Sequence, residues 1–129
     1  MSRYVFVYGT LMRGFRSPVS EQFEACSRFI SEGVVKGYLY EIDRYPGLII
    51  DHSAPQGVYG EVYEILDQSL LDVLDDYENC SEAFEKPWEY ERVLEAIQCG
   101  DKSYQAWVYV YRWPIDSSNL ISSGDYKNW

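Results

Sequence analysis

Apolar and aromatic residues are grouped in short runs, and most of these runs have the length of a β-strand. Residues 3–8 predict the first strand, and the glycine-containing segment 9–15 predicts a loop after it. Residues 45–50 predict a turn that leads into a short strand. Residues 90–98 and 103–112 predict the last two strands, so strands dominate the chain.

The last predicted strand shows a regular alternation of side-chain types. Successive side chains of a strand point to opposite faces of the sheet. The two faces are therefore expected to carry Ala106, Val108 and Val110 on one side, and Trp107, Tyr109 and Tyr111 on the other. The polar segment 79–88 predicts a loop, and residues 114–129 predict an irregular tail.

Two segments have the apolar spacing of helices. Ser17 can cap a helix and Pro18 suits the first helical position, so the first helix is predicted to begin there and to end at Gly33. Its apolar positions are Phe23, Cys26 and Ile30. Asp67 predicts the N-cap of the second helix. The apolar positions of that helix are Leu70, Leu71, Leu74 and Tyr77.

Two segments in the middle of the chain resemble each other. Residues 35–42 and 58–65 share the pattern V-x-G-x-(L/V)-Y-E-I. A glycine inside a strand marks a bulge or a close approach of another backbone, so both segments are predicted to be bent strands. Two copies are too few for a solenoid. The pattern as a whole predicts a strand-dominated α+β fold in which the sheet curls toward a small barrel.

The chain has 129 residues, and this length predicts a single domain over residues 1–129. Hydrophobic residues make up 47% of it and aromatic residues 17%, which is enough for a buried core and argues against global disorder. The formal net charge is −10. Such an acidic chain is unsuited to binding nucleic-acid phosphates or an anionic membrane, and the charge most simply reflects solubility.

The chemistry of metal sites and disulfides finds little support in the sequence. The three cysteines, Cys26, Cys80 and Cys99, are far apart and form no CxxC motif, and His52 is the one histidine. We therefore expect neither a disulfide framework nor a metal site. The N-terminus lacks the features of a signal peptide, and no apolar run approaches the roughly 20 residues that span a bilayer. A cytoplasmic location is expected.

Glu78 is the first candidate for catalysis. It follows Leu71 by seven residues and Leu74 by four, so on a helix it extends the apolar stripe and points toward the core. Burial raises the pKa of a carboxyl toward the range of a general base, and Asp75 is expected to raise it further by repulsion. The alternative is a glutamate at a helix end that bends out to solvent.

Two further candidate sites lie at strand ends. The segment Tyr8, Gly9, Thr10 and Leu11 follows the first strand, and its backbone N–H groups could hold a carboxylate or an oxyanion. A plain glycine turn is the alternative. In the strand that begins near residue 90, alternation places Tyr90 and Arg92 on one face, from which they could reach a substrate. A surface ion pair beside a packed tyrosine would give the same pattern.

Other nucleophilic or paired-acid sites are less well supported. Cys80 has no histidine other than His52 to activate it, and the chain has no GxSxG motif. Asp75 and Asp76 are adjacent on a helix and therefore point about 100° apart, so they do not form a pair of facing carboxylates.

Several motifs occur together in one order between residues 4 and 111: VFVYGTL-x-x-G, GYLY, YPGLI, GEVYEI, LDDYE, Y-x-R and AWVYVY. In this combination the chain resembles the γ-glutamylcyclotransferase-like superfamily, which includes the avirulence-induced branch. The YGTL and LDDYE segments are most similar to the γ-glutamylamine cyclotransferase branch.

This resemblance implies a small mixed or antiparallel β-barrel with flanking helices. It also implies a cofactor-independent reaction in which a γ-glutamyl amine or peptide is cleaved to 5-oxoproline and a free amine. Glu78 matches the family's catalytic acid/base. Tyr8, Gly9, Thr10 and Leu11 match its substrate-binding loop, and Tyr90 matches an aromatic residue near the pocket. Asn79 stands where the family usually has glycine, and the segment 81–89 is longer than in the branch that it most resembles.

Two other functions remain open at this point. The same barrel could bind an acidic or amine ligand without turnover. It could also be a protein-interaction domain that uses exposed aromatic residues, namely Trp113, Tyr126 and Trp129. The expected partner is a small γ-glutamyl substrate rather than nucleic acid or membrane. The leaving amine is open, and so is a homodimeric state.

Overall fold

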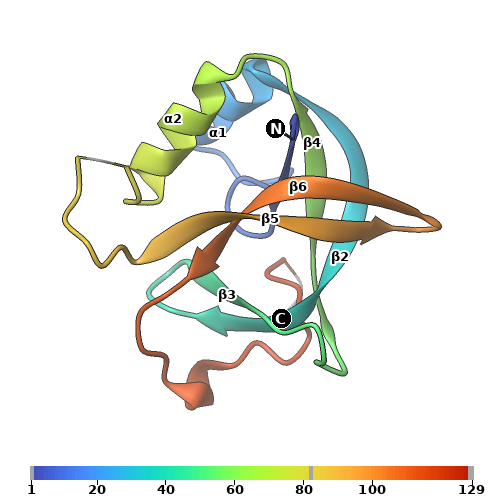
Figure 1. Ribbon diagram of the computed structural model, residues 1–129, viewed down its shortest axis with the longest axis vertical. Coiled ribbons are helices and arrows are strands. Elements are labelled where there is room, and N and C mark those ends of the chain that lie inside the picture. Colours follow the sequence, from blue (N-terminus) through green and yellow to red (C-terminus); the bar gives the residue numbers. More distant parts are fainter. Residues whose placement is uncertain (1, 82, 128–129) are drawn as a thin grey trace.

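A computed structural model describes residues 2–81 and 83–127 of the chain and defines its helices and strands (Figure 1). Strands dominate this part of the chain, as the sequence predicts. The order is β1 (Tyr4–Val7), α1 (Pro18–Ala25), β2 (Ser27–Glu41), β3 (Pro46–Ile50), β4 (Gly57–Ile65), α2 (Ser69–Tyr77), β5 (Tyr90–Cys99), β6 (Lys102–Tyr111) and the 3₁₀ helix η1 (Ser117–Asn119).

The strands form one mixed sheet that closes on itself. Its order is β3-β2-β4-β1-β6-β5, and a pairing of Val34 in β2 with Gln98 in β5 closes the ring. The β1–β6 pair is parallel, and the other pairs are antiparallel. β3 extends the sheet from β2 beyond the closed ring. The predicted barrel is confirmed.

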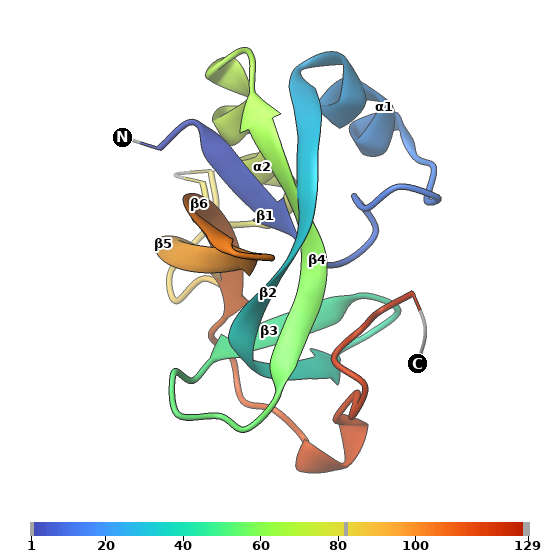
Figure 2. The same ribbon diagram turned by 90° about the vertical axis from the view of Figure 1, so that its right-hand side faces the viewer.

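The two similar segments of the sequence become neighbouring antiparallel strands. Residues 27–36 of β2 pair with β4, whereas residues 37–41 pair with β3, so β2 changes partner in its course (Figure 2). Gly37 lies at this change. A Cβ atom there would lie 2.2 Å from the carbonyl oxygen of Ile49, so this close approach requires glycine. The close approach of another backbone that the glycine predicts is confirmed.

Both faces of the second half of β6 are buried, because the barrel interior lies on one side and the helices cover part of the other. The alternation predicted from the sequence is confirmed. One core cluster includes Ala106, Val108 and Val110. The other cluster contains Tyr109 and Tyr111, with Trp107 packed against it. The second cluster also holds the apolar residues of α2, so the helix is fixed against the sheet.

The first helix begins as predicted, but it is much shorter. Ser17 is the N-cap, and it forms a reciprocal capping box with Ser20. The prediction that the helix continues to Gly33 is wrong, because the chain enters β2 at Ser27. There the backbone pairs with β4, and the ring of Phe29 packs against that of Tyr63. Long-range pairing therefore overrides the helical spacing of the apolar residues.

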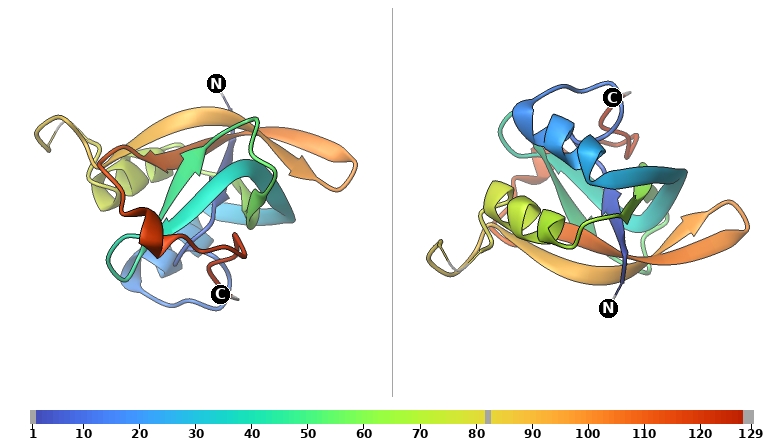
Figure 3. Two further views of the ribbon diagram at one scale, coloured as in Figure 1. Left: turned by 90° about the horizontal axis from the view of Figure 1, so that it is seen from below. Right: turned by 90° about the horizontal axis from the view of Figure 1, so that it is seen from above.

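The second helix begins one residue later than predicted. Its N-cap is Gln68, and the Asp67 carboxylate accepts hydrogen bonds from the N–H and hydroxyl of Ser69. Both helices lie at the same end of the barrel (Figure 3). Neither they nor η1, within the part of the chain described, are long and apolar enough to cross a membrane. The three cysteines are free thiols.

Candidate active site

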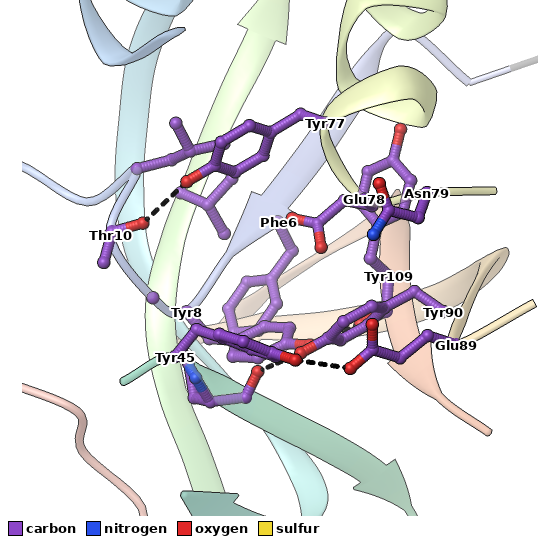
Figure 4. Close-up of a pocket in the computed structure, with 14 residues that line it drawn as sticks. Phe6, Tyr8, Thr10, Tyr45, Tyr77, Glu78, Asn79, Glu89, Tyr90 and Tyr109 are labelled. Carbon is purple, nitrogen blue, oxygen red and sulfur yellow. Dashed lines mark hydrogen bonds between the residues drawn. The ribbon is translucent and has the colours of Figure 1, made fainter. Parts of the chain in front are cut away.

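A cavity of about 280 Å³ opens where β1 ends, beside the C-terminus of α2 and the first residue of β5 (Figure 4). Glu78, the loop Tyr8–Leu11 and Tyr90 all line it, although they come from three separate parts of the chain. The lining residues are Phe6, Val7, Tyr8, Gly9, Thr10, Leu11, Tyr45, Pro46, Tyr77, Glu78, Asn79, Glu89, Tyr90 and Tyr109.

The end of α2 holds Glu78 at the cavity. Glu78 is the C-cap residue, and its N–H donates to the carbonyl oxygen of Leu74 at 2.9 Å. The helix ends in a Schellman motif, in which Cys80 N–H donates to the Asp75 carbonyl and Asn79 N–H to that of Asp76. These bonds fix the backbone on both sides of Glu78, so its carboxyl projects into the cavity (Figure 4).

The Glu78 carboxyl lies in an unusual electrostatic environment. Burial, together with the carboxylate of Glu89, raises its pKa to about 8. No side chain or N–H in residues 2–81 and 83–127 donates a hydrogen bond to this carboxyl. The loss of hydration is therefore uncompensated, and the proton is held up to neutral pH.

Asp75 does not have the role that the sequence predicts. Its carboxylate accepts hydrogen bonds from Nε of Arg92 at 2.9 Å and from the hydroxyl of Tyr109 at 2.6 Å. This pairing holds the Asp75 charge outside the cavity. The repulsion that raises the pKa of Glu78 comes from Glu89 instead, because Glu89 shares the cavity with it.

The loop Tyr8–Leu11 forms the wall on the β1 side. Its fold is set by a turn in which Met12 N–H donates to the carbonyl of Gly9 at 3.1 Å, and by a contact of 3.3 Å between the hydroxyl oxygens of Thr10 and Tyr77. The N–H groups of Thr10 and Leu11 donate to no acceptor in the described part of the chain. They remain available to an anionic group in the cavity.

Gly9 is required by packing within the protein. A Cβ atom at this position would lie 2.9 Å from Cγ of Pro46, which is too close for the rigid proline ring. The loop therefore contacts Pro46, the first residue of β3, through a residue that has no side chain.

The tyrosines of the cavity hold one another and the backbone in place. Tyr90 donates a hydrogen bond to the Pro46 carbonyl at 2.6 Å, and Tyr8 donates one to the Tyr109 carbonyl at 2.5 Å. Burial raises the pKa of both Tyr8 and Tyr90, so both hydroxyls stay protonated. The result is a rigid aromatic wall around the Glu78 carboxyl.

Arg92 does not line the cavity, so of the two interpretations of this strand the structure fits the ion pair beside a packed tyrosine. Its guanidinium forms the ion pair with Asp75 and stacks over the ring of Trp107, 4.4 Å from the centroid. The alternation of β5 places residues 90 and 92 on the same side of the strand. Two residues span almost 7 Å, however, and this is enough to carry Arg92 past the cavity.

The sequence and the fold of this chain match those of known proteins. The family model described as "Gamma-glutamyl cyclotransferase, AIG2-like" matches residues 5–128. The chain belongs to this family. It is 32% identical to MJ1514 of Methanocaldococcus jannaschii over 127 residues, or 98% of this chain and 97% of the relative. It is also 32% identical to γ-glutamylaminecyclotransferase A of Danio rerio over 114 residues, or 81% of this chain and 66% of the relative.

A solved structure supports the same assignment. The crystal structure of an AIG2-like protein from Mus musculus superimposes with a TM-score of 0.72 at 26% identity, over 90% of this chain and 81% of the mouse chain. The barrel with two helices is thus the fold of this family. The likeness to the γ-glutamylamine branch, noted from the YGTL and LDDYE segments, agrees with the zebrafish relative.

The backbone explains how asparagine can stand at position 79, where the resemblance implies a glycine. Asn79 has φ of 58°, in the left-handed region that glycine adopts most easily and asparagine tolerates best among the other residues. Asn79 thus supplies the same C-terminal cap of α2 that a glycine would. Its side chain lines the cavity next to Glu78.

Sequence reasoning did not assign roles to several lining residues. Glu89 and Tyr45 are the most important, since the Tyr45 hydroxyl donates to the Glu89 carboxylate at 2.6 Å. Tyr45 and Pro46 are within the YPGLI motif, which could have drawn attention to them. Glu89 belongs to a polar segment with no distinguishing pattern. No cluster of three or more His, Cys, Asp or Glu side chains suited to a metal ion is present among residues 2–81 and 83–127.

Two of the three exposed aromatic residues that suggested an interaction domain can be located. Trp113 is 43% exposed, and its indole N–H donates to the carbonyl of Pro87. The Tyr126 hydroxyl donates to the carbonyl of Arg44, and its ring packs against Phe15. Trp129 lies outside the described residues. Trp113 and Tyr126 therefore hold loops in place, and neither lines the cavity.

Proposed function

We propose that this chain is a γ-glutamyl cyclotransferase that releases 5-oxoproline and a free amine from a γ-glutamyl amine or peptide. The observation that carries the proposal is the Glu78 carboxyl, which has no hydrogen-bond donor in the described chain and faces the backbone of the Tyr8–Leu11 loop across a small cavity. Family membership supports the same reaction class.

In the first step, the Glu78 carboxylate takes a proton from the α-ammonium group of the substrate. The incoming ammonium stabilises the carboxylate form, so its binding lowers a pKa that burial has raised to about 8. The neutral α-amine then attacks the γ-carbonyl carbon. A C–N bond forms, and the carbonyl oxygen gains the negative charge.

In the second step, the proton held by Glu78 passes to the nitrogen of the leaving group. The bond between that nitrogen and the γ-carbon breaks, and the carbonyl reforms within the ring of 5-oxoproline. The ring nitrogen gives up its second proton to the released amine, which departs as an ammonium ion. Glu78 returns to its starting state, with no net change in the protein.

The cavity supplies orientation for this intramolecular reaction. The free N–H groups of Thr10 and Leu11 suit the α-carboxylate of the glutamyl group or the oxygen that gains charge. The rigid tyrosine wall restricts the substrate to folded conformations. Holding the amine and the carbonyl in reacting geometry can contribute about 7–11 kcal/mol to lowering the barrier.

The proposal is tested with purified protein and a panel of γ-glutamyl compounds, including γ-glutamyl-alanine and ε-(γ-glutamyl)-lysine. At least one compound should yield 5-oxoproline, and Glu78→Gln should abolish the release while retaining the fold. Asp76→Asn is the matched control, because Asp76 is exposed near the same end of α2 and lies outside the cavity. It should retain the wild-type rate.

Two outcomes would overturn the proposal. One is the absence of 5-oxoproline across the panel, and the other is undiminished release by a folded Glu78→Gln protein. If 5-oxoproline or glutamyl compounds raise the thermal stability of the protein without product formation, the cavity is a non-catalytic binding site.

A further inference from the structure

The ionisable carboxyl groups of the cavity have no basic side chain beside them in its lining. Two acidic side chains, Glu78 and Glu89, line it, and none of the fourteen lining residues in the described chain is Lys, Arg or His. A γ-glutamyl group carries one α-ammonium and one α-carboxylate, so it adds no net charge. With such a group bound, the cavity would still hold more negative than positive charge.

Glu89 is the acid that the proposed mechanism leaves unused. It is 8% exposed, and its backbone carbonyl accepts a hydrogen bond from the N–H of Arg112 at 2.8 Å, which fixes its position at the start of β5. The Tyr45 hydroxyl donates to Oε2, and no described residue donates to Oε1. Glu89 is therefore a buried carboxylate with one oxygen unpartnered beside the cavity (Figure 4).

A buried carboxylate without a cationic partner is costly, and a ligand that supplies the missing charge gains from pairing with it. Charge-assisted hydrogen bonds to an ammonium are about twice as strong as neutral ones. The surplus negative charge thus favours a substrate with one more positive group than the γ-glutamyl unit alone.

We propose that Glu89 binds a second ammonium group carried by the leaving amine, so that the preferred substrates are γ-glutamyl derivatives of diamines. This proposal rests on the proposed function and makes Glu89 the residue that determines the leaving group. Tyr45 is the positioning residue, since its hydroxyl orients the Glu89 carboxylate through Oε2 and leaves Oε1 for the ligand.

The leaving group is a better partner for Glu89 than the α-ammonium. The α-ammonium must lose a proton before it can attack, and a second carboxylate beside it would hold that proton more firmly. An ammonium at the far end of the leaving amine keeps its proton throughout the reaction. It can therefore stay bound to Glu89 without opposing the chemistry.

The experiment compares two substrates of nearly equal shape, γ-glutamyl-1,4-diaminobutane and γ-glutamyl-n-pentylamide. They differ in a terminal ammonium against a methyl group. The wild-type protein should process the cationic compound with a kcat/KM at least about tenfold higher. In Glu89→Gln this ratio should fall at least about tenfold, because a neutral amide replaces the charge. Tyr45→Phe should reduce the ratio by a smaller factor.

Glu91→Gln is the matched control, since it removes the same charge two residues along β5 from an exposed ion pair with Arg112. Its substrate ratio should equal that of the wild type. The proposal is overturned if the wild type does not prefer the cationic compound. It is also overturned if Glu89→Gln lowers kcat/KM equally for both compounds, which would place Glu89 at the α-ammonium.

Failure of the proposed function can be told apart from failure of this inference. If no compound yields 5-oxoproline, calorimetric binding of the two compounds to wild-type protein still measures the charge preference. Tighter binding of the cationic compound, lost in Glu89→Gln, supports the Glu89 site without any turnover. Equal binding rejects it. A Glu89→Gln protein that does not fold leaves the wild-type comparison and Tyr45→Phe as tests.

Discussion

Glu61 and Glu78 are two buried or partly buried carboxyls on either side of the same loop, and they have opposite surroundings. Glu61 in β4 is 2% exposed and accepts hydrogen bonds from N–H and Nε of Arg13 and from the Tyr63 hydroxyl. The Nζ atom of Lys127 lies 3.5 Å from Oε2 of Glu61. Glu78 accepts none from the described chain.

The difference shows how partners decide what an acidic side chain does. Burial disfavours ionisation of Glu61, but the donors of Arg13, with Tyr63 and Lys127, outweigh it and lower the pKa. The ionised Glu61 thereby holds the loop after β1 against the barrel. Glu78 keeps a raised pKa of about 8, so its proton can be exchanged near neutral pH. One carboxyl is structural, and the other is available for chemistry.

The largest expected effect comes from Glu78→Gln. Removal of a general acid/base costs about 10²–10⁴-fold in rate, and we expect a loss of about 10³-fold in kcat for 5-oxoproline release. The free energy of unfolding should not decrease, because no hydrogen bond to this side chain is lost. Chromatographic measurement of product and urea denaturation check the two parts. A loss of stability equal to that of Glu61→Gln would refute the contrast.

Glu61→Gln should have the complementary effect. Removing one partner from a buried ion pair costs about 3–5 kcal/mol, and we expect about 3 kcal/mol here because the Arg13 side chain is partly exposed. Because the loop that follows β1 loosens, KM should rise more than kcat falls. Urea denaturation and steady-state kinetics measure the two effects. An unchanged KM would show that Glu61 does not position the loop.

The pH dependence of stability should have opposite signs at the two sites. Glu61, with a lowered pKa, contributes stability above about pH 4.5 that is lost as pH falls. Glu78 binds more protons when folded than when unfolded between its unfolded pKa of 4.5 and its folded pKa of about 8, so the free energy of unfolding falls as pH rises through that window.

Glu78→Gln should consequently gain stability relative to the wild type as the pH rises. Between about pH 5 and about pH 8.5, the gain should be on the order of 2 kcal/mol, since one pKa unit is worth about 1.4 kcal/mol and partial exposure reduces the full shift. Denaturation curves across this range measure it. A difference that is constant with pH would mean that the carboxyl is hydrated.

Gly9→Ala tests the contact between the loop and Pro46, the first residue of β3. The new methyl group would lie 2.9 Å from Cγ of Pro46, and overpacking of this kind costs about 1–3 kcal/mol. Displacement of Pro46 would also disturb the carbonyl that holds Tyr90. We expect a lower melting temperature and a severalfold higher KM. An unchanged melting temperature of the Gly9→Ala protein would show that Pro46 can move away from the new methyl group without cost.

The smallest effect is expected for Asn79→Gly. Glycine removes the cost of a side chain at positive φ, but asparagine already tolerates this conformation, so the gain should be no more than about 0.5 kcal/mol. The rate of 5-oxoproline release should stay within about twofold of wild type. A larger change in rate would show that the Asn79 side chain contacts the substrate, which it could do from its place in the cavity.

Several features of the fold are determined by interactions between residues that are close in the sequence. The alternation of residues 103–112, the shared glycine-containing pattern of β2 and β4, and the cap at Ser17 each follow from interactions between near neighbours. The placement of Glu78 on the apolar stripe of a helix is of the same kind, because a helix fixes its direction within two turns. The order of the motifs between residues 4 and 111 then indicated the γ-glutamylcyclotransferase-like family.

Only the tertiary structure decided which partner each residue meets. The residues after Ala25 have helical spacing but form a strand that pairs with β4. The Asp75 carboxylate accepts a hydrogen bond from Arg92. Glu89, which follows Glu78 by eleven residues in the chain, is the charged group that raises the pKa of Glu78. The physical reason is that burial, repulsion and hydrogen bonding depend on distance in space. The spacing of Glu78 from Leu71 and Leu74 indicated an inward direction but left open a side chain that bends out to solvent. The tertiary structure decided that the carboxyl lies at the cavity, and that no described residue donates a hydrogen bond to it.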